Sequence, residues 1–348
     1  MFSQMVKRLG LGTVLIVLAA ACLLLSDWQQ RAGHSGRITQ IAIFQFNSVK
    51  LLEDGVHGLQ ARLKEKGIAE GPNYHFELFN AHDEMATANA IARELVSGKY
   101  DYVFTVSTNC LQVVANANKD GRVKHIFGVV ADPMAAKVGI IPGDPLGHPK
   151  HLVGIGSLMP VDEIMDAARK FNPRLKKFGL PWNPSQANSE KYAQMARVVA
   201  KQMGVELMEG SVENTTMVGQ VTGSLVARGA DAILALGDLT VAVAIDSVVA
   251  EARKGGIPVL SIMTDAVPHG ALFAAGSDYF QIGKQMGDMG ALAIGGEPIA
   301  KIKLLYSVPK TYSVNLLARE GLKEDWRIPD DLIAKATVVI DKTGTHKK

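Results

Sequence analysis

The sequence lacks the residue patterns on which most families of enzymes depend. It contains no phosphate-binding P-loop, no HExxH zinc motif, no nucleophile elbow and no pair of cysteines at zinc-binding spacing. Two histidines, His148 and His151, lie three residues apart, but in a loop rich in proline and glycine and without an obvious third ligand. We therefore expect no catalysis, no cofactor and no metal ion.

The chain also has little cysteine and little net charge. Its two cysteines are Cys22 and Cys110, and Cys22 lies in an N-terminal apolar run, so an internal disulfide is not expected. The formal net charge is +3, and the basic residues are scattered among acids, which argues against a nucleic-acid-binding protein. With 47% hydrophobic and 20% charged residues, the composition is that of a globular protein, and 348 residues suggest two lobes.

One long apolar run is present, at residues 9–25, close to the minimum of about 17 residues that span a bilayer. Lys7 and Arg8 precede it, and this basic flank predicts export of everything that follows to the periplasm. We interpret residues 1–37 as an uncleaved signal anchor in the inner membrane with its linker. Two alternatives stay open, a cleaved signal peptide and a lipoprotein modified at Cys22.

Beyond this segment, strand-like and helix-like segments alternate along the chain. Residues 38–46 form an apolar run of buried-strand length, and apolar residues at helical spacing follow it up to Gly67. The alternation restarts at Lys176, after a stretch rich in proline and glycine at 140–152. This predicts an α/β fold of two doubly wound parallel-sheet lobes. The expected division is 38–152 plus 276–304 for lobe 1, and 153–275 plus 305–342 for lobe 2.

Short polar residues follow nearly every predicted strand. In open parallel sheets, ligands bind beyond the carboxyl ends of the strands, where helix N-termini favour an anionic group. Each of these residues is also a preferred helix N-cap, so capping is the alternative for any one of them. The predicted ligand-binding residues are Asn47, Ser48, Ser107, Thr108, Asn109, Asp132, Asn183, Ser185, Asn188, Asp238, Thr240 and Asp265.

Three of these residues, Asp132, Asp238 and Asp265, are acids that directly follow apolar strands. An acid that stays ionised in a partly dry cleft needs a cation or several hydrogen-bond donors, and a ligand ammonium would supply the cation. Aromatic residues such as Trp182 and Tyr279 could stack on a ligand side chain, or belong to the core.

Four stretches carry a resemblance to a known family. They are MATANAIA within residues 70–108, VVADPMAAKVG at 129–139, WNPSQANSEKYAQM at 182–195, and TDAVPHGALFAAGSDYFQIGKQMGDM at 264–289. In this order and spacing they resemble the ABC transporter substrate-binding proteins whose described members bind aromatic amino acids such as tryptophan. The resemblance extends from about residue 38 to residue 340. It implies a type I periplasmic-binding fold with three crossovers, and delivery of the ligand to an ABC permease and its ATPase.

The resemblance also implies roles for particular residues. Ser107, Thr108 and the backbone around Asp132 would hold a ligand carboxylate, Asp265 and Asp238 its ammonium, and residues 183–188 would line the second lobe. We therefore predict an extracytoplasmic solute-binding protein of an ABC uptake system for a small amino-acid-like ligand. The alternative is a membrane-anchored sensor that signals to a partner without transport.

Overall fold

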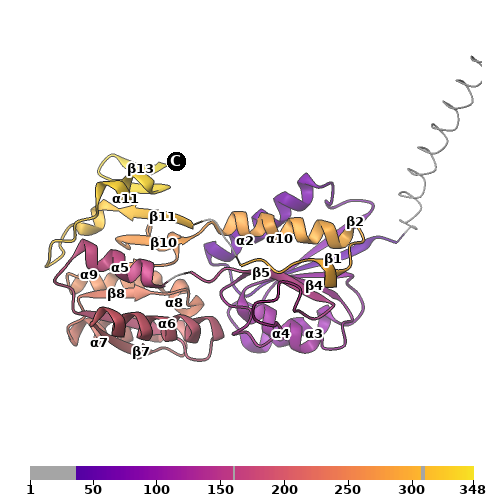
Figure 1. Cartoon of the computed structure of the whole chain (residues 1–348), viewed down its shortest axis with the longest axis horizontal. Coiled ribbons are helices and arrows are strands. Elements are labelled where there is room, and N and C mark those ends of the chain that lie inside the picture. Colours follow the sequence, from indigo (N-terminus) through magenta and orange to yellow (C-terminus); the bar gives the residue numbers. More distant parts are fainter. Residues whose placement is uncertain (1–36, 160, 307–309) are drawn as a thin grey trace, which may run out of the picture. The chain divides into compact units, whose positions relative to one another are not determined.

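The structure is a computed structural model that describes residues 37–159, 161–306 and 310–348 (Figure 1). The predicted membrane segment at 9–25 and Cys22 lie outside these residues. Residues 40–69 and 76–348 form one compact unit, which contains both sheets and the site described below. Within the described ranges, no helix combines the length and the apolar character needed to cross a bilayer.

The first lobe contains a five-stranded sheet with the order β2-β1-β3-β4-β5, the strand order of flavodoxin-like doubly wound folds. The pairs β1–β3, β3–β4 and β4–β5 are parallel. Helices α2 and α10 cover one face of this sheet, and α3 and α4 cover the other (Figure 1). The elements are β1 (Thr39–Gln45), α2 (Lys50–Glu65), β2 (Tyr74–Asn80), α3 (Met85–Leu95), β3 (Tyr102–Val106), α4 (Thr108–Ala117), β4 (Lys124–Val130), β5 (Leu152–Gly156), α10 (Tyr279–Ile294) and the 3₁₀ turn η2 (Ile299–Lys301).

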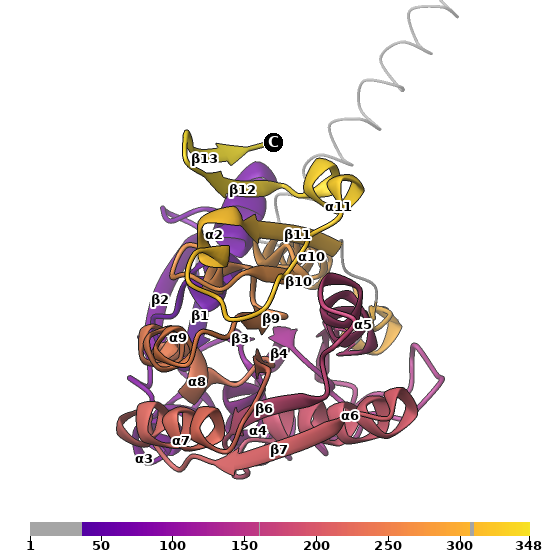
Figure 2. The same ribbon diagram turned by 90° about the vertical axis from the view of Figure 1, so that its left-hand side faces the viewer.

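The second lobe contains an eight-stranded sheet with the order β13-β12-β11-β10-β9-β8-β6-β7. Its last five strands in this order are parallel and repeat the topology of lobe 1. Figure 2 shows α5 and α6 on one side of this sheet, and α7 and α9 on the other. The elements are α5 (Val161–Phe171), β6 (Lys177–Trp182), α6 (Ala187–Met203), β7 (Glu206–Ser211), α7 (Thr215–Ala227), β8 (Ala232–Ala235), α8 (Leu239–Val243), α9 (Ile245–Lys254), β9 (Val259–Ser261), η1 (Thr264–Ala266), β10 (Phe273–Ser277), β11 (Lys310–Asn315), η3 (Leu316–Arg319), α11 (Asp330–Lys335), β12 (Val338–Asp341) and β13 (Gly344–Lys347).

The C-terminal edge of the second sheet is mixed, whereas the sequence predicted parallel strands throughout. β11 is antiparallel to β10 and parallel to β12, and β13 is antiparallel to β12. The tight turn between β12 and β13 explains the last reversal, because a hairpin can join only antiparallel strands.

The chain changes lobes three times, after β5, after β10 and before β11. The expected boundary between residues 152 and 153 falls inside β5, and the whole of β5 pairs with β4. Likewise, β10 pairs with β11 up to Ser277, two residues beyond the expected boundary. Leu305 still pairs with Ile155 of the first lobe. The stretch at 140–152 therefore leads into β5, the last strand of lobe 1, and does not itself connect the lobes.

Helix ends follow sequence signals. Ser107, Asn214 and Asp278 cap α4, α7 and α10 by accepting hydrogen bonds from backbone N–H groups two or three residues ahead, at 3.0–3.2 Å. Gly204 ends α6 with a φ of 64°, a left-handed conformation that glycine adopts without steric cost. These caps place each helix start at the carboxyl end of a strand.

Helices α2 and α10 approach each other closely because glycines lie at their contact. A Cβ atom at Gly58 would lie 2.0 Å from the carbonyl oxygen of Phe280, and one at Gly283 would lie 2.1 Å from that of Gly55. Figure 1 shows the two helices side by side. This contact fixes the start of α2 relative to the start of α10.

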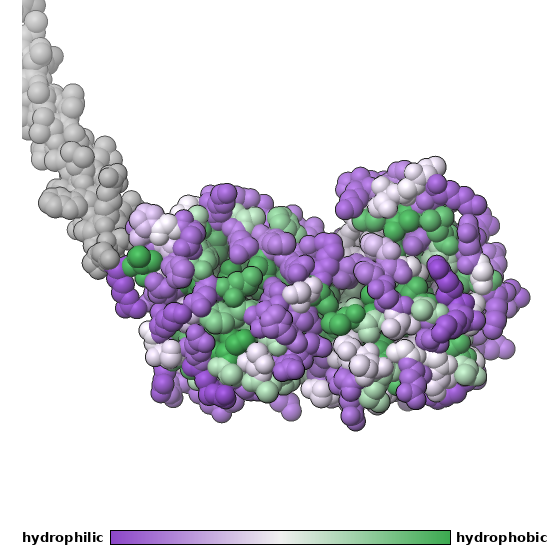
Figure 3. Space-filling view, turned by 180° about the vertical axis from the view of Figure 1, so that it is seen from behind, coloured by the Kyte–Doolittle hydropathy of each residue, from purple (hydrophilic) through white to green (hydrophobic). Residues whose placement is uncertain are grey.

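Figure 3 shows the face of the molecule opposite to the one seen in Figure 1. This surface is mostly polar, and its apolar side chains lie in small groups. Exposed apolar residues such as Leu78, Val198 and Leu292 belong to different elements. Such scattered side chains are normal on a protein surface.

Candidate functional site: a cavity at the carboxyl ends of the strands

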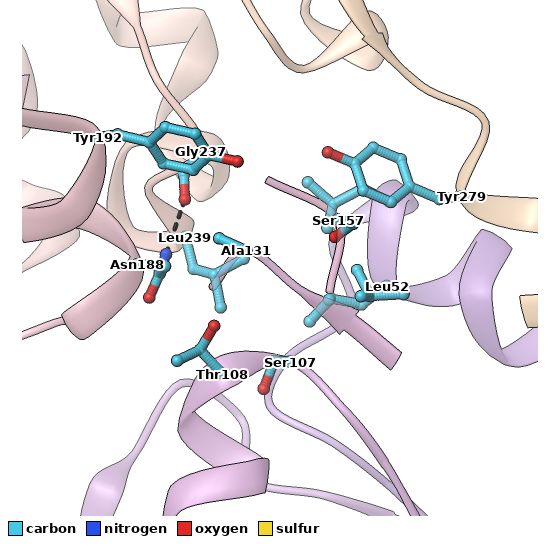
Figure 4. Close-up of a pocket in the computed structure, with 12 residues that line it drawn as sticks. Leu52, Ser107, Thr108, Ala131, Ser157, Asn188, Tyr192, Gly237, Leu239 and Tyr279 are labelled. Atoms are coloured by element: carbon cyan, nitrogen blue, oxygen red, sulfur yellow. Dashed lines mark hydrogen bonds between the residues drawn. The ribbon is translucent and has the colours of Figure 1, made fainter. Parts of the chain in front are cut away.

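A cavity with about 390 Å³ of unfilled space, counting its open mouth, lies among residues of both lobes (Figure 4). The apolar part of its wall consists of Leu51, Leu52, Val129, Ala131 and Leu239. The polar part consists of Ser107, Thr108, Ser157, Asn188, Tyr192, Tyr279 and the backbone of Gly237. Of the described residues that line it, none carries a charged side chain.

The start of α4 supplies two hydroxyls to this wall. Ser107 Oγ accepts a hydrogen bond from the N–H of Cys110 at 3.1 Å, so Ser107 both caps the helix and lines the cavity. Its backbone has a φ of 135°, in a region that residues other than glycine rarely occupy. Thr108 follows as the first residue of the helix. The unpaired N–H groups of such a helix start favour a bound anion.

A second strained residue lines the cavity. Val129 has a φ of 54°, which is unusual for a β-branched side chain. It lies in an irregularity of the β4–β5 register between Phe127 and Val130. Irregularities of this kind redirect side chains and occur often beside functional sites. Two of the strained positions in the described chain therefore lie at this cavity.

Asn188, from the start of α6, presents an unsatisfied acceptor. Its Nδ2 donates to the carbonyl oxygen of Gly237 at 2.7 Å. Its Oδ1 is buried and has no hydrogen-bond partner among the described residues. A buried acceptor without a donor destabilises a protein by about 1–3 kcal/mol. A ligand N–H group in the cavity would remove this penalty.

Two tyrosines from different lobes face each other across the cavity. Figure 4 shows the rings of Tyr192 (α6) and Tyr279 (α10) on opposite sides, with their hydroxyls directed into the space between them. Burial raises the pKa of Tyr192 to about 12 and also raises the pKa of Tyr279, which the nearby Tyr192 and Asp265 raise further. Both phenols are therefore neutral at physiological pH. Tyr192 is not among the ligand-binding residues that the sequence predicted.

Asp132 and Asp238 lie outside the cavity wall and have protein partners. Asp132 forms an ion pair with Lys191 of the other lobe at 3.0 Å and accepts hydrogen bonds from two backbone N–H groups that follow it. Asp238 accepts from the N–H of Asn183 at 2.6 Å, from the N–H of Val241 at 2.9 Å and from a serine hydroxyl. Its pKa is raised by burial, against which these donors act. Both acids hold loops in place.

The polar loop at residues 183–189 is held in place by hydrogen bonds to Asp238 and Thr240. Thr240 Oγ1 accepts hydrogen bonds from Asn183 Nδ2 at 3.0 Å and from Gln186 Nε2 at 2.8 Å. Ser185 donates to Asn183 Oδ1 at 2.7 Å. Most amides and hydroxyls of this loop therefore serve to fix its shape, and Asn188 is the one that reaches the cavity wall.

Asp265, in η1, is half-buried and lies outside the cavity wall, but near Tyr279, whose pKa it raises. Burial is the main cause that raises the pKa of Asp265 itself, and the charge of Asp54 on α2 adds to it. Among the described residues, no side chain forms a hydrogen bond or ion pair with its carboxylate. Its own backbone N–H and the nearby His269 and Lys50 act in the opposite direction, but of the three predicted acids it is the one without a side-chain hydrogen bond or ion pair among the described residues.

The remaining predicted residues lie away from the cavity wall. Asn47 donates to Asp83 at 3.2 Å, Ser48 accepts from Asn80 at 2.9 Å, and Asn109 is buried in α4. The wall thus contains three of the predicted residues, Ser107, Thr108 and Asn188. No group of three or more metal-binding side chains occurs in the part of the chain that the structure describes.

Two doubly wound lobes with a cavity at the carboxyl ends of their strands define a type I periplasmic-binding fold, as predicted. The chain belongs to the ABC transporter substrate binding protein family, whose model matches residues 40–340. Proteins of this family bind small molecules outside the cytoplasm and work with an ABC permease and its ATPase. The predicted family is therefore confirmed.

Individual relatives add detail. The tyrosine-binding protein of Clostridioides difficile (strain R20291) is 27% identical over 274 residues, which cover 79% of this chain and 78% of the relative. The crystal structure of a conserved domain protein from Vibrio cholerae matches with a TM-score of 0.80 and 28% identity, covering 87% of this chain and 100% of that chain. An ABC domain from Streptococcus pneumoniae in complex with L-Trp shares the fold, with a TM-score of 0.80, 21% identity and the same coverage.

Proposed function

We propose that this protein is the solute-binding subunit of an ABC uptake system whose ligand is an amino acid with an uncharged aromatic side chain. The observation that carries the proposal is the cavity wall, which combines polar groups suited to a zwitterion with an apolar surface and no charged side chain. A relative described as a tyrosine-binding protein and a similar structure in complex with L-Trp support it.

In this proposal the ligand carboxylate lies at the start of α4. Ser107 and Thr108 donate their hydroxyl protons to it, and the free N–H groups of the helix start add a favourable field. The proton of Ser107 is available because its oxygen acts as the acceptor toward Cys110.

The ligand ammonium needs acceptors, and two groups of the second lobe are suited to this role. Asn188 Oδ1 is a buried acceptor without a donor, and Asp265 is a carboxylate that forms no ion pair among the described residues. An ammonium group would satisfy the amide and lower the pKa of Asp265. We assign Asp132 and Asp238 to maintaining the walls, because both already have partners.

We also propose that residues 9–25 tether the protein to the inner membrane. The run is long enough to span a bilayer, and a basic pair precedes it. Fractionation of cells that express the full-length protein tests this. We expect the protein in the membrane fraction after alkaline carbonate washing, and its release by that washing would contradict the tether.

Isothermal titration calorimetry of the full-length protein in mild detergent, against the standard amino acids, tests the binding function. We expect heat of binding with aromatic amino acids and none with lysine, arginine, aspartate or glutamate. Thr108→Val removes a wall hydroxyl at nearly constant volume and should weaken binding about tenfold or more. The control, Thr87→Val on α3, should leave affinity unchanged. Binding of no amino acid by the folded protein would refute the proposal.

A further inference from the structure

The two cavity tyrosines indicate which aromatic side chain the protein selects. We propose that Tyr192 and Tyr279 are specificity-determining residues that both donate hydrogen bonds to one oxygen atom at the end of the ligand side chain. The protein then prefers a 4-hydroxyphenyl side chain, that of tyrosine, over phenyl and indole side chains. This inference rests on the function proposed above and specifies its ligand.

The hydroxyl of Tyr192 has a proton that needs an acceptor. Its oxygen accepts the backbone N–H of Met159 at 3.3 Å, so its own proton is left to donate. The residue is only 4% exposed, and bulk water therefore has little access to it. Among the described residues, this hydroxyl donates no hydrogen bond. The group that accepts its proton is consequently expected to be a ligand.

Tyr279 presents a second such donor from the other side. It is the first residue of α10, and its hydroxyl forms no hydrogen bond with the described residues. Its ring lies opposite that of Tyr192, and the two hydroxyls point toward each other in Figure 4. Because burial raises the pKa of both groups, both keep their protons at neutral pH.

The position of the pair favours the side-chain end of the ligand. In Figure 4, Ser107 and Thr108 lie at one end of the view and the two tyrosine rings at the other. A carboxylate at the start of α4 therefore directs the rest of the ligand toward the tyrosines. Leu51, Leu52 and Val129 provide apolar surface for an aromatic ring.

The donor and acceptor capacity of each candidate side chain decides among them. A phenol oxygen accepts hydrogen bonds from both tyrosines, whereas an indole N–H only donates and a phenyl ring does neither. Tryptophan and phenylalanine would leave the Tyr192 proton buried without an acceptor. Sites built to hydrogen-bond a ligand hydroxyl discriminate strongly against analogues that lack it.

Calorimetry of the full-length protein with L-tyrosine, L-phenylalanine and L-tryptophan tests this inference. We expect wild-type protein to bind tyrosine at least about tenfold more tightly than phenylalanine. Tyr279→Phe and Tyr192→Phe should each weaken tyrosine binding by about tenfold and change phenylalanine binding much less. The control is Tyr312→Phe on β11, whose hydroxyl bonds to Glu163 outside the cavity, and it should change neither affinity.

Two results would overturn the inference while leaving the proposed function intact. One is equal wild-type affinity for tyrosine and phenylalanine. The other is an equal loss for both ligands in the two variants, which would show that the pair binds the carboxylate instead. Tyr279→Phe keeps the Met159 contact, so a folding defect confined to Tyr192→Phe does not obscure the result. If no amino acid binds at all, the proposed function itself fails, and this inference with it.

Discussion

Asp238 and Asp265 are both shielded carboxylates that follow apolar strands, but their surroundings differ. Asp238 is 1% exposed and accepts hydrogen bonds from Asn183, Val241 and Ser189. Asp238→Ala would leave these donors buried without an acceptor, and we expect a loss of about 3 kcal/mol in the free energy of unfolding. Asp265→Ala removes a carboxylate that forms no side-chain hydrogen bond or ion pair among the described residues. We expect it to abolish ligand binding with little effect on stability.

Urea unfolding and calorimetry on both variants measure the two effects separately. A strong loss of stability in Asp265→Ala, or tight ligand binding by it, would contradict the assignment of Asp265 to the ligand ammonium. Full stability of Asp238→Ala would show that its hydrogen bonds are not needed for the fold.

His125 on β4 gives the fold a pH dependence. It is fully buried, and burial lowers its pKa to about 3, compared with about 6.5 in an unfolded chain. Between about pH 3 and pH 6.5, His125 is protonated in the unfolded chain but neutral in the folded protein. The stabilising contribution is therefore complete above pH 6.5 and decreases as the pH falls toward 3, by at most about 1.4 kcal/mol per pH unit.

The measurement is urea unfolding at pH 7.5 and pH 4.5. The loss of stability between the two should be smaller in His125→Gln than in the wild type. His57→Gln, at an exposed position on α2, is the control and should show the wild-type loss. An unchanged loss in His125→Gln would indicate that carboxylates alone cause the acid sensitivity.

At the scale of elements, the contact between α2 and α10 determines the shape of one side of the cavity, because Leu51, Leu52 and Tyr279 lie at the starts of these helices. Gly283→Ala places a Cβ atom against the backbone of Gly55, so the helices must separate. We expect destabilisation by about 1–3 kcal/mol together with weaker ligand binding.

Gly219→Ala in α7 is the matched control. The nearest atom to its new Cβ would be 3.5 Å away, an ordinary contact, so we expect unchanged binding and a gain of up to about 1 kcal/mol from helix propensity. Thermal unfolding and calorimetry measure both variants. Equal stability of the two would contradict a close contact between the backbones of α2 and α10.

The elements show how far the sequence predicts this molecule. Periodicity predicts the alternating strands and helices, and the rule for strand ends predicts Ser107, Thr108 and Asn188 in the wall. Leu51, Leu52 and Tyr192 escape prediction because an apolar residue at helical spacing has the same signature whether it faces a core or a cavity. The sequence predicted that a ligand ammonium would stabilise the charges of Asp132 and Asp238. In the structure, Lys191 pairs with Asp132, and hydrogen-bond donors of the protein contact Asp238.

At the scale of the whole molecule, the ion pair between Asp132 and Lys191 joins the two lobes beside the cavity. Asp132 is 4% exposed, so the pair is shielded from solvent on one side. We expect Lys191→Met to weaken ligand binding several-fold, because the bound arrangement loses a contact between lobes.

Titrations at 0.05 M and 0.5 M salt test this contribution. Wild-type affinity should decrease with salt more than that of Lys191→Met, because screening weakens the pair. Lys201→Met, at an exposed position on the same helix, is the control and should retain the wild-type salt dependence. Identical salt slopes for all three proteins would contradict a role of the pair in binding.

The first lobe is completed by a helix from late in the chain. Phe104 of β3 packs against α10 at Gly290, and the hydroxyl of Tyr102 donates to the carbonyl oxygen of Ala293. A chain that leaves the membrane N-terminus first therefore cannot finish this lobe until β6 to β10 of the second lobe have followed. The half-built sheet must meanwhile be kept from aggregating, so the folding of this protein during export depends on whatever shields that apolar face.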